Sequence, residues 1–304
     1  MTTSTFQLGP ELHFEQPDTF IYNGSELSWL CSNSIYTLKR SVSAPQNPFQ
    51  PEHFEVTHQE LVLKDELLDA HITDSYTSLL TAQTILHGSN LNSLTELNIK
   101  DLHPNCIDVQ LSKNGFLVQS SSKFGGRYTL HDWKGNSWKL PVGAFEARIF
   151  PEDLAVVWWE NKSDILYRWA PLKENIMLAG QMLLPIIDVR LGSWPLIIVE
   201  SKKECVFWER NHRLDLEAQT ASTIVGERVL SVGEKNITVE AYNNAQLQTQ
   251  VKIDANDFEL LGLLDDIGIV MDENGFAYIC TKDNTLEPLN LSFSITSESE
   301  DTIR

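Results

Sequence analysis

A short pattern of residues recurs seven times between Tyr36 and Tyr278, and it limits the possible folds more than any other feature of the chain. Each copy is an apolar run, a polar break and a second run with an aromatic or bulky apolar centre, as in PLIIVESKKECVFWER. The second runs centre on residues about 40 positions apart along the chain, which are Tyr36, Leu86, Thr129, Tyr167, Phe207, Val239 and Tyr278. A period of this length with several strands per repeat is typical of a β-propeller.

The repeat therefore predicts an all-β chain that forms a single seven-bladed β-propeller of four-stranded blades. We expect the blades at about 15–66, 67–103, 104–143, 144–184, 185–220, 221–254 and 255–293. Three prolines in residues 41–58 predict a long loop in the first blade, and residues 294–304 read as a flexible acidic tail. The alternating segment 5–14 would let the N-terminus pair with the last blade and close the ring.

In period and strand rhythm the chain resembles the WD-repeat superfamily of propellers over roughly residues 14–293. The Gly-His and Trp-Asp dipeptides of that family are missing, and LHDW, LYRW and VFWER stand where a third strand would end in Trp-Asp. The resemblance implies protein binding through the ring faces and loops. It identifies no binding residue.

Acidic residues are concentrated at the two ends of the sequence. The chain has 42 acidic and 23 basic residues, a net charge of −19. Residues 1–75 carry a net charge of −8 and residues 254–304 a net charge of −10, whereas residues 76–253 carry only −1. In a closed ring the first and last blades are neighbours, so this charge would gather in one acidic sector that attracts a basic partner and repels nucleic-acid phosphates. The alternative is that the acidity serves only solubility.

The sequence suggests two groups of residues for protein interaction. Carboxylates beside the predicted turns of the first and last blades would form the acidic sector, and aromatic rings of the Pro-rich loop would anchor a partner. The candidates are Asp265, Asp266, Asp272, Glu273, Asp65, Glu66, Asp69, Phe49 and Phe54.

We find no motif that assigns a catalytic, cofactor-binding or metal-binding residue, and we predict no small-molecule ligand. The four cysteines contain no C-x-x-C pair and fall in apolar runs, which favours buried free thiols. His131 reads as a structural histidine. First strands would bring a handful of polar side chains to the channel, which keeps an enzyme as an alternative: His71, Asp108, Arg148, Asp188 and Arg190.

The favoured function is a non-catalytic scaffold, a docking subunit of an intracellular multiprotein complex that binds other protein subunits. A dedicated chaperone or carrier for one basic protein, such as a histone or ribosomal protein, is the first alternative. The N-terminus lacks the basic start and apolar stretch of a signal peptide, and no apolar run reaches membrane-spanning length. We therefore expect the nucleus or cytoplasm and no membrane contact.

Overall fold

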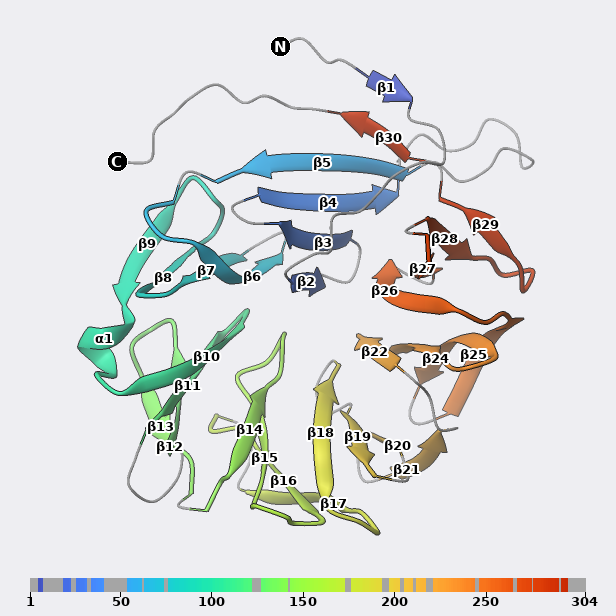
Figure 1. Ribbon diagram of the computed structural model, residues 1–304. Helices are drawn as coiled ribbons and strands as arrows, with labels where there is room; N and C mark the ends of the chain where they lie inside the picture. The colour runs from blue at the N-terminus through green and yellow to red at the C-terminus, as the bar shows by residue number, and fades with distance from the viewer. Residues whose placement is uncertain are drawn as a thin grey trace.

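The computed structural model describes most of the chain between residues 5 and 294. The described ranges are 5–7, 19–22, 26–31, 34–40, 54–61, 63–73, 76–121, 127–141, 143–172, 176–192, 197–202, 205–209, 212–216, 221–243, 246–264, 267–274, 276–289 and 291–294. Within them the strands form antiparallel sheets that follow one another around a ring (Figure 1).

Six of the described sheets have four strands, each in the order of the chain. The first three contain β6 (Leu67–Thr73), β7 (Tyr76–Thr81), β8 (Thr84–Gly88) and β9 (Leu94–Asn98); β10 (Cys106–Ser112), β11 (Gly115–Ser120), β12 (Arg127–Asp132) and β13 (Ser137–Lys139); and β14 (Glu146–Ile149), β15 (Val156–Trp159), β16 (Ile165–Trp169) and β17 (Met177–Gln181). The next three contain β18 (Ile186–Leu191), β19 (Ile197–Ser201), β20 (Cys205–Glu209) and β21 (His212–Leu216); β22 (Ala221–Val225), β23 (Arg228–Val232), β24 (Asn236–Asn243) and β25 (Gln246–Asp254); and β26 (Phe258–Leu264), β27 (Ile267–Asp272), β28 (Ala277–Cys280) and β29 (Leu286–Pro288).

The remaining sheet joins the two ends of the chain. Its strands are β2 (Thr19–Tyr22), β3 (Glu26–Cys31), β4 (Ser34–Arg40), β5 (Phe54–Glu60), β30 (Leu291–Ser294) and β1 (Thr5–Gln7), in that order from the inside outwards. The strand β30 runs parallel to β5, and β1 is antiparallel to β30. The last and first sheets also touch at β26 and β3, and β2 lies beside β6, so the ring is closed (Figure 1).

The prediction of a single seven-bladed propeller of four-stranded blades is wrong. Five of the sheets are four-stranded blades with side chains described in every strand, namely those that begin at β6, β10, β14, β22 and β26. The sheet of β2–β5 instead has six strands, because the expected last strand of the final blade is broken after Pro288 and its second half, β30, leaves to cover β5. The N-terminal strand β1 follows β30 onto that sheet and does not pair with the final one. An uncovered β5 would present a free sheet edge.

The second strand of a blade in chain order is its most buried strand, as the apolar sequences of these strands indicate. All four residues of β15 are buried, and in β23 all but the first are buried. Such strands are covered on both faces, because each sheet packs against a neighbour on either side. The core is accordingly divided into clusters between adjacent sheets, and one of them joins Leu38 and Phe54 of the first sheet to Leu264 and Ile269 of the last.

Between β9 and β10 a single helical turn, α1 (Ile99–Leu102), begins at Asn98, whose side chain accepts a hydrogen bond from the Lys100 N–H. Residues 58–72, whose spacing also suits a helix, are strand at both ends, in β5 and β6. No helix of the described chain has the length and apolar character that a membrane crossing requires. The tail beyond residue 294 lies outside the described residues, as does most of the Pro-rich segment 41–58.

Candidate protein-interaction site

Four neighbouring inner strands, β6, β10, β14 and β18, start in the same way. In β6, β10 and β18 the ladder with the second strand is interrupted, and one extra residue is inserted before an aspartate: Leu68, Ile107 and Ile187. In β14 the ladder begins at Glu146, and the Phe145 N–H bonds to Trp159 just before it. A bulge bends its strand and redirects a side chain, and bulges are common beside functional sites.

Each of these four starts exposes one large apolar side chain. Leu68 is 50% exposed, Ile107 61%, Phe145 46% and Ile187 52%. Each is followed directly by a carboxylate, at Asp69, Asp108, Glu146 and Asp188. The inner strands lie side by side in the order β6, β10, β14, β18, so the eight residues form one row, which we call the inner arc (Figure 1).

Among the inner-strand residues whose side chains the structure describes, only these four blades start with an exposed apolar residue followed by a carboxylate. The strand β26 has a similar bulge between Leu260 and Gly262, but its extra residue, Leu261, is only 4% exposed and precedes a glycine. A bulge therefore does not by itself expose the inserted side chain. The combination of an exposed apolar side chain and a carboxylate belongs to the inner arc.

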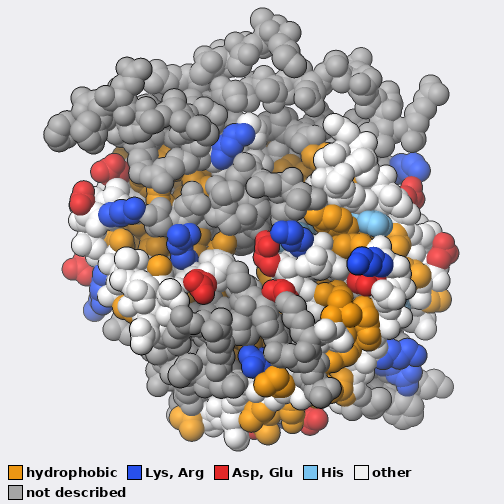
Figure 2. Space-filling model, turned by 180° about the vertical axis from the view of Figure 1, so that it is seen from behind, with side chains coloured by type: hydrophobic (Ala, Val, Ile, Leu, Met, Phe, Trp, Pro, Cys, Tyr) orange, Lys and Arg blue, Asp and Glu red, His pale blue; other side chains and the backbone are white. Residues whose placement is uncertain are grey.

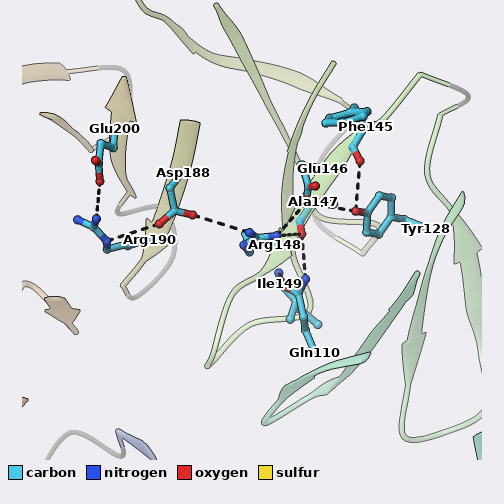
Figure 3. Close-up of polar contacts among 10 residues, drawn as sticks. All are labelled: Gln110, Tyr128, Phe145, Glu146, Ala147, Arg148, Ile149, Asp188, Arg190 and Glu200. Atoms are coloured by element: carbon cyan, nitrogen blue, oxygen red, sulfur yellow. Dashed lines mark hydrogen bonds and ion pairs between the residues drawn. The ribbon is translucent and has the colours of Figure 1, made fainter. Parts of the chain in front are cut away.

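One half of the inner arc is neutralised by a chain of ion pairs (Figure 3). Arg148 Nη1 lies 3.2 Å from Glu146 Oε2, and Arg148 Nη2 lies 3.7 Å from Asp188 Oδ1. Arg190 continues the chain, because its Nε is 3.7 Å from Asp188 Oδ2 and its Nη2 donates to Glu200. Both guanidiniums are about one-third exposed, so solvent screens these pairs and each contributes modestly to stability.

Hydrogen bonds from the neighbouring blade hold β14 in place. Gln110 of β10 donates to the Ala147 carbonyl at 3.0 Å and accepts from the Ile149 N–H at 3.2 Å, which satisfies backbone groups at the free edge of β14 (Figure 3). The Tyr128 hydroxyl donates to the Phe145 carbonyl at 3.3 Å. These contacts fix the position of Phe145 and Glu146 at the rim.

The other half of the inner arc keeps its negative charge. Among the described residues no Lys or Arg forms an ion pair with Asp69 or Asp108. Burial raises the pKa of Asp69 to about 6, the hydrogen bond from the Ala70 N–H opposes that rise, and the charge of Asp108 adds to it. The negative charges of Asp69 and Asp108 are therefore not compensated by a cation among the described residues.

The remaining channel candidate, His71, lies inside the core. It is 7% exposed, and its Nε2 has no hydrogen-bond partner in the described part of the chain. Burial lowers its pKa to about 4, with the charge of Glu152 opposing and that of Lys113 adding to the shift. The imidazole of His71 is therefore neutral at pH 7.

A second surface of exposed apolar residues surrounds β17, the outermost strand of its blade. Its members are Leu172 (71% exposed), Ile176 (48%), Leu178 (57%) and Leu183 (78%), and we call it the outer patch. The space-filling view likewise shows hydrophobic side chains gathered in patches among charged ones, on the face opposite to that of Figure 1 (Figure 2).

The structure places the residues suggested by the sequence in different environments. Asp265, Asp266 and Phe49 lie outside the described residues. Phe54 is 1% exposed in β5 and packs in the core between the first and last sheets, so it is no exposed loop anchor.

The described acidic candidates also differ in their surroundings. Asp65 is half-buried, Glu66 is exposed just before β6, and Glu273 is exposed in the turn after β27. Asp272 organises that turn, because its Oδ1 accepts from the Asn274 and Phe276 N–H groups. Asp69 is part of the inner arc.

Within the described residues, no three His, Cys, Asp or Glu side chains are grouped so that they could hold a metal. Cys280 is buried, as expected for a strand thiol, and burial raises its pKa to about 12. Cys106 is only partly buried, because it stands at the start of β10 beside the exposed Ile107.

The sequence already contained a signal for the inner arc. The runs LDA, IDV, FEA and IDV stand at the starts of four predicted first strands, each an apolar residue, a carboxylate and another apolar residue. The alternation of apolar and charged residues in these runs is also that of an ordinary strand, so the sequence did not reveal that the first apolar residue is exposed. In three of the four runs the first apolar residue is the one inserted at a bulge, and in all four runs it is exposed.

Comparison with known proteins gives the fold class. No protein-family model and no curated protein sequence matches the chain. The solved structure of Kluyveromyces lactis Hsv2p is similar with a TM-score of 0.55 at 12% identity, over 91% of this chain and 96% of that one. Kluyveromyces marxianus Hsv2 has a TM-score of 0.53 at 10% identity, over 93% and 98% of the two chains. A chain of the mitotic checkpoint complex has a TM-score of 0.51 at 12% identity, over 91% and 92%.

The ring of sheets and these likenesses together define the fold as a β-propeller. At 10–12% identity the likeness concerns the fold alone.

Proposed function

We propose that this propeller is a non-catalytic docking subunit of an intracellular multiprotein complex, which contacts a basic partner through the acidic sector of its first and last sheets. The observation that carries the proposal is the grouping of exposed large apolar side chains into the inner arc and the outer patch. Scattered apolar residues are normal on a monomer, but contiguous groups usually mark interaction surfaces.

The position of the acidic ends supports the second half of the proposal. The first and last sheets share a core cluster and pair through β30 and β5, so the described strands at the two ends of the chain are neighbours in the ring. Glu66, Glu273 and Glu287 are exposed there. The electrostatic field of a group of exposed carboxylates accelerates the encounter with a basic protein surface.

The experiment is affinity purification of the tagged full chain from cells that express it, followed by size-exclusion chromatography of what is recovered. A docking subunit should elute with stable partners in fixed ratio. A chaperone for one basic protein should instead elute with a single client and lose it steeply as salt rises. A chain that elutes alone at its native level would contradict both.

The acidic sector is tested with two matched variants. The first combines Glu66→Gln, Glu273→Gln and Glu287→Gln; the second combines Glu160→Gln, Glu227→Gln and Glu234→Gln, which are exposed in the middle blades. The first should slow association and reduce its salt dependence, and the second should change little. Equal binding by both variants would mean that the acidity serves solubility.

A further inference from the structure

Two features of the inner arc point to the chemistry of what it binds. Its apolar side chains Leu68, Ile107, Phe145 and Ile187 stand in a row across four blades. The carboxylates beside them are compensated at one end only, because Arg148 and Arg190 pair with Glu146, Asp188 and Glu200.

We propose that the inner arc binds a linear segment of a partner protein that carries a Lys or Arg beside large apolar residues, with the cation between Asp69 and Asp108. This inference rests on the proposed docking function and narrows it to one surface and one kind of partner. The cation would supply the positive charge that the described residues near these two carboxylates lack. The apolar residues of the segment would cover side chains that are now half exposed to water.

The chemistry of Asp69 supports the choice of a basic ligand. A half-buried carboxylate that stands next to a second carboxylate is costly to ionise, and its raised pKa reports that cost. A cation bound between them would reverse the effect. Residues that reduce stability without serving the fold are characteristic of binding sites.

The spacing of the strands sets the spacing of the ligand. Neighbouring inner strands of the arc contact one another directly, and an extended chain advances about 3.3 Å per residue. Contacts on successive blades would therefore come from positions about two or three residues apart in the segment. A folded basic surface would show no such period.

The test is selection of linear peptides from a random display library on the purified full chain at low salt, followed by anisotropy titration of the selected peptides. The selected sequences should contain Lys or Arg, with large apolar residues two or three positions away. Matched peptides with the base replaced by Glu, or the apolar residues by Ser, should bind at least tenfold more weakly.

Four variants locate the binding. Asp69→Asn with Asp108→Asn, and Leu68→Ser with Ile107→Ser, should each weaken the selected peptides at least tenfold. Glu160→Gln with Glu227→Gln, and Leu102→Ser with Leu247→Ser, which are exposed outside the inner arc and the outer patch, should stay within twofold. A melting curve checks that every variant is folded.

The proposal is wrong if no peptide is selected, if the selected peptides lack basic residues, or if both inner-arc variants bind them within twofold of the unmodified chain. Failure of the docking function looks different. In that case the full chain recovers no stable partner from cells. If partners are recovered and the inner-arc variants retain them, the docking function stands and the inner arc is not its site.

Discussion

The Nε2 atoms of His103 and His131 face each other at 2.7 Å, with the ring centroids 4.9 Å apart. This centroid separation is nearly the maximum possible for two imidazole rings whose Nε2 atoms are so close. Each Nε2 therefore points almost directly at the other. One nitrogen must carry a hydrogen and the other must accept it, because two N–H groups cannot share this space. His131 also stacks on Phe116, and His103 Nδ1 bonds to the Ser120 hydroxyl at 3.3 Å.

This pair predicts a loss of stability in acid. Burial lowers the pKa of His131 to about 4, and the neighbouring His103 adds to the shift. The folded state therefore binds fewer protons than the unfolded state between pH 6.5 and pH 4, so the free energy of unfolding falls as the pH falls through that window. We expect this histidine to contribute about 2 kcal/mol to that fall.

The variant His131→Gln provides the measurement, by urea unfolding at pH 7 and pH 4.5. It should be less stable at pH 7 by about 1–2 kcal/mol, since it loses the stacking on Phe116. It should then lose less on acidification than the unmodified chain. Equal losses would show that the pair is not the acid-sensitive element.

Asp69 predicts the opposite dependence on pH. Its folded pKa of about 6 is raised above the ordinary value of 3.8, so the folded state holds the proton more tightly and stability is lost as the pH rises from 3.8 to 6. Asp69→Asn should stabilise the chain by about 1–2 kcal/mol at pH 7.5 and have little effect at pH 4. Urea unfolding at both pH values measures this, and destabilisation at pH 7.5 would contradict it.

Gly115 is predicted to tolerate no side chain. A Cβ at this position would lie 1.9 Å from the backbone oxygen of His131 and 2.8 Å from Leu154 Cδ1. Since a strand backbone must move to relieve the first contact, Gly115→Ala should cost about 3 kcal/mol or more. Gly135→Ala is the control: it has open space around it but a φ of +91°, so it should cost only about 1 kcal/mol.

The turn after β27 depends on Asp272. Its Oδ1 accepts from two backbone N–H groups, and its Oδ2 accepts from the Tyr278 hydroxyl at 3.3 Å. Asp272→Ala should therefore destabilise by about 1–2 kcal/mol in thermal unfolding, and Asp272→Asn by less, because its amide oxygen still accepts. The exposed neighbour Glu273→Ala should stay within about 0.5 kcal/mol. A neutral effect of Asp272→Ala would show that the turn holds without it.

Arg190 joins two blades, since it contacts Asp188 and Glu200 in its own sheet and donates to the Ser222 hydroxyl of the next. Arg190→Gln should lower the free energy of unfolding by about 1–2 kcal/mol. The loss is smaller than for a buried ion pair, because solvent screens these partly exposed charges. Arg190→Lys should recover only part of this, because one ammonium cannot reach all three partners. Full recovery by Lys in denaturant titrations would show that only the charge matters.

Much of the fold was predictable from local patterns. A sheet covered on both faces requires apolar runs in its inner strands, and this requirement is written into consecutive residues such as 155–159 and 197–199. The period of about 40 residues is equally local. The propeller fold follows from the same features and is supported by the solved structures.

The sequence alone thus determined a ring of sheets and a concentration of acidic residues at the two ends of the chain. Both can be recognised locally, because strand rhythm and composition do not depend on distant contacts. The tertiary structure decided which side chains remain in water. Phe54 is buried because the last sheet packs against it, and β30 leaves its own blade because β5 offers a free edge. Leu68 and Ile107 are exposed where bulges interrupt the starts of β6 and β10. Exposure is a property of the whole assembly of strands, so the inner arc could be recognised only once the blades were in place.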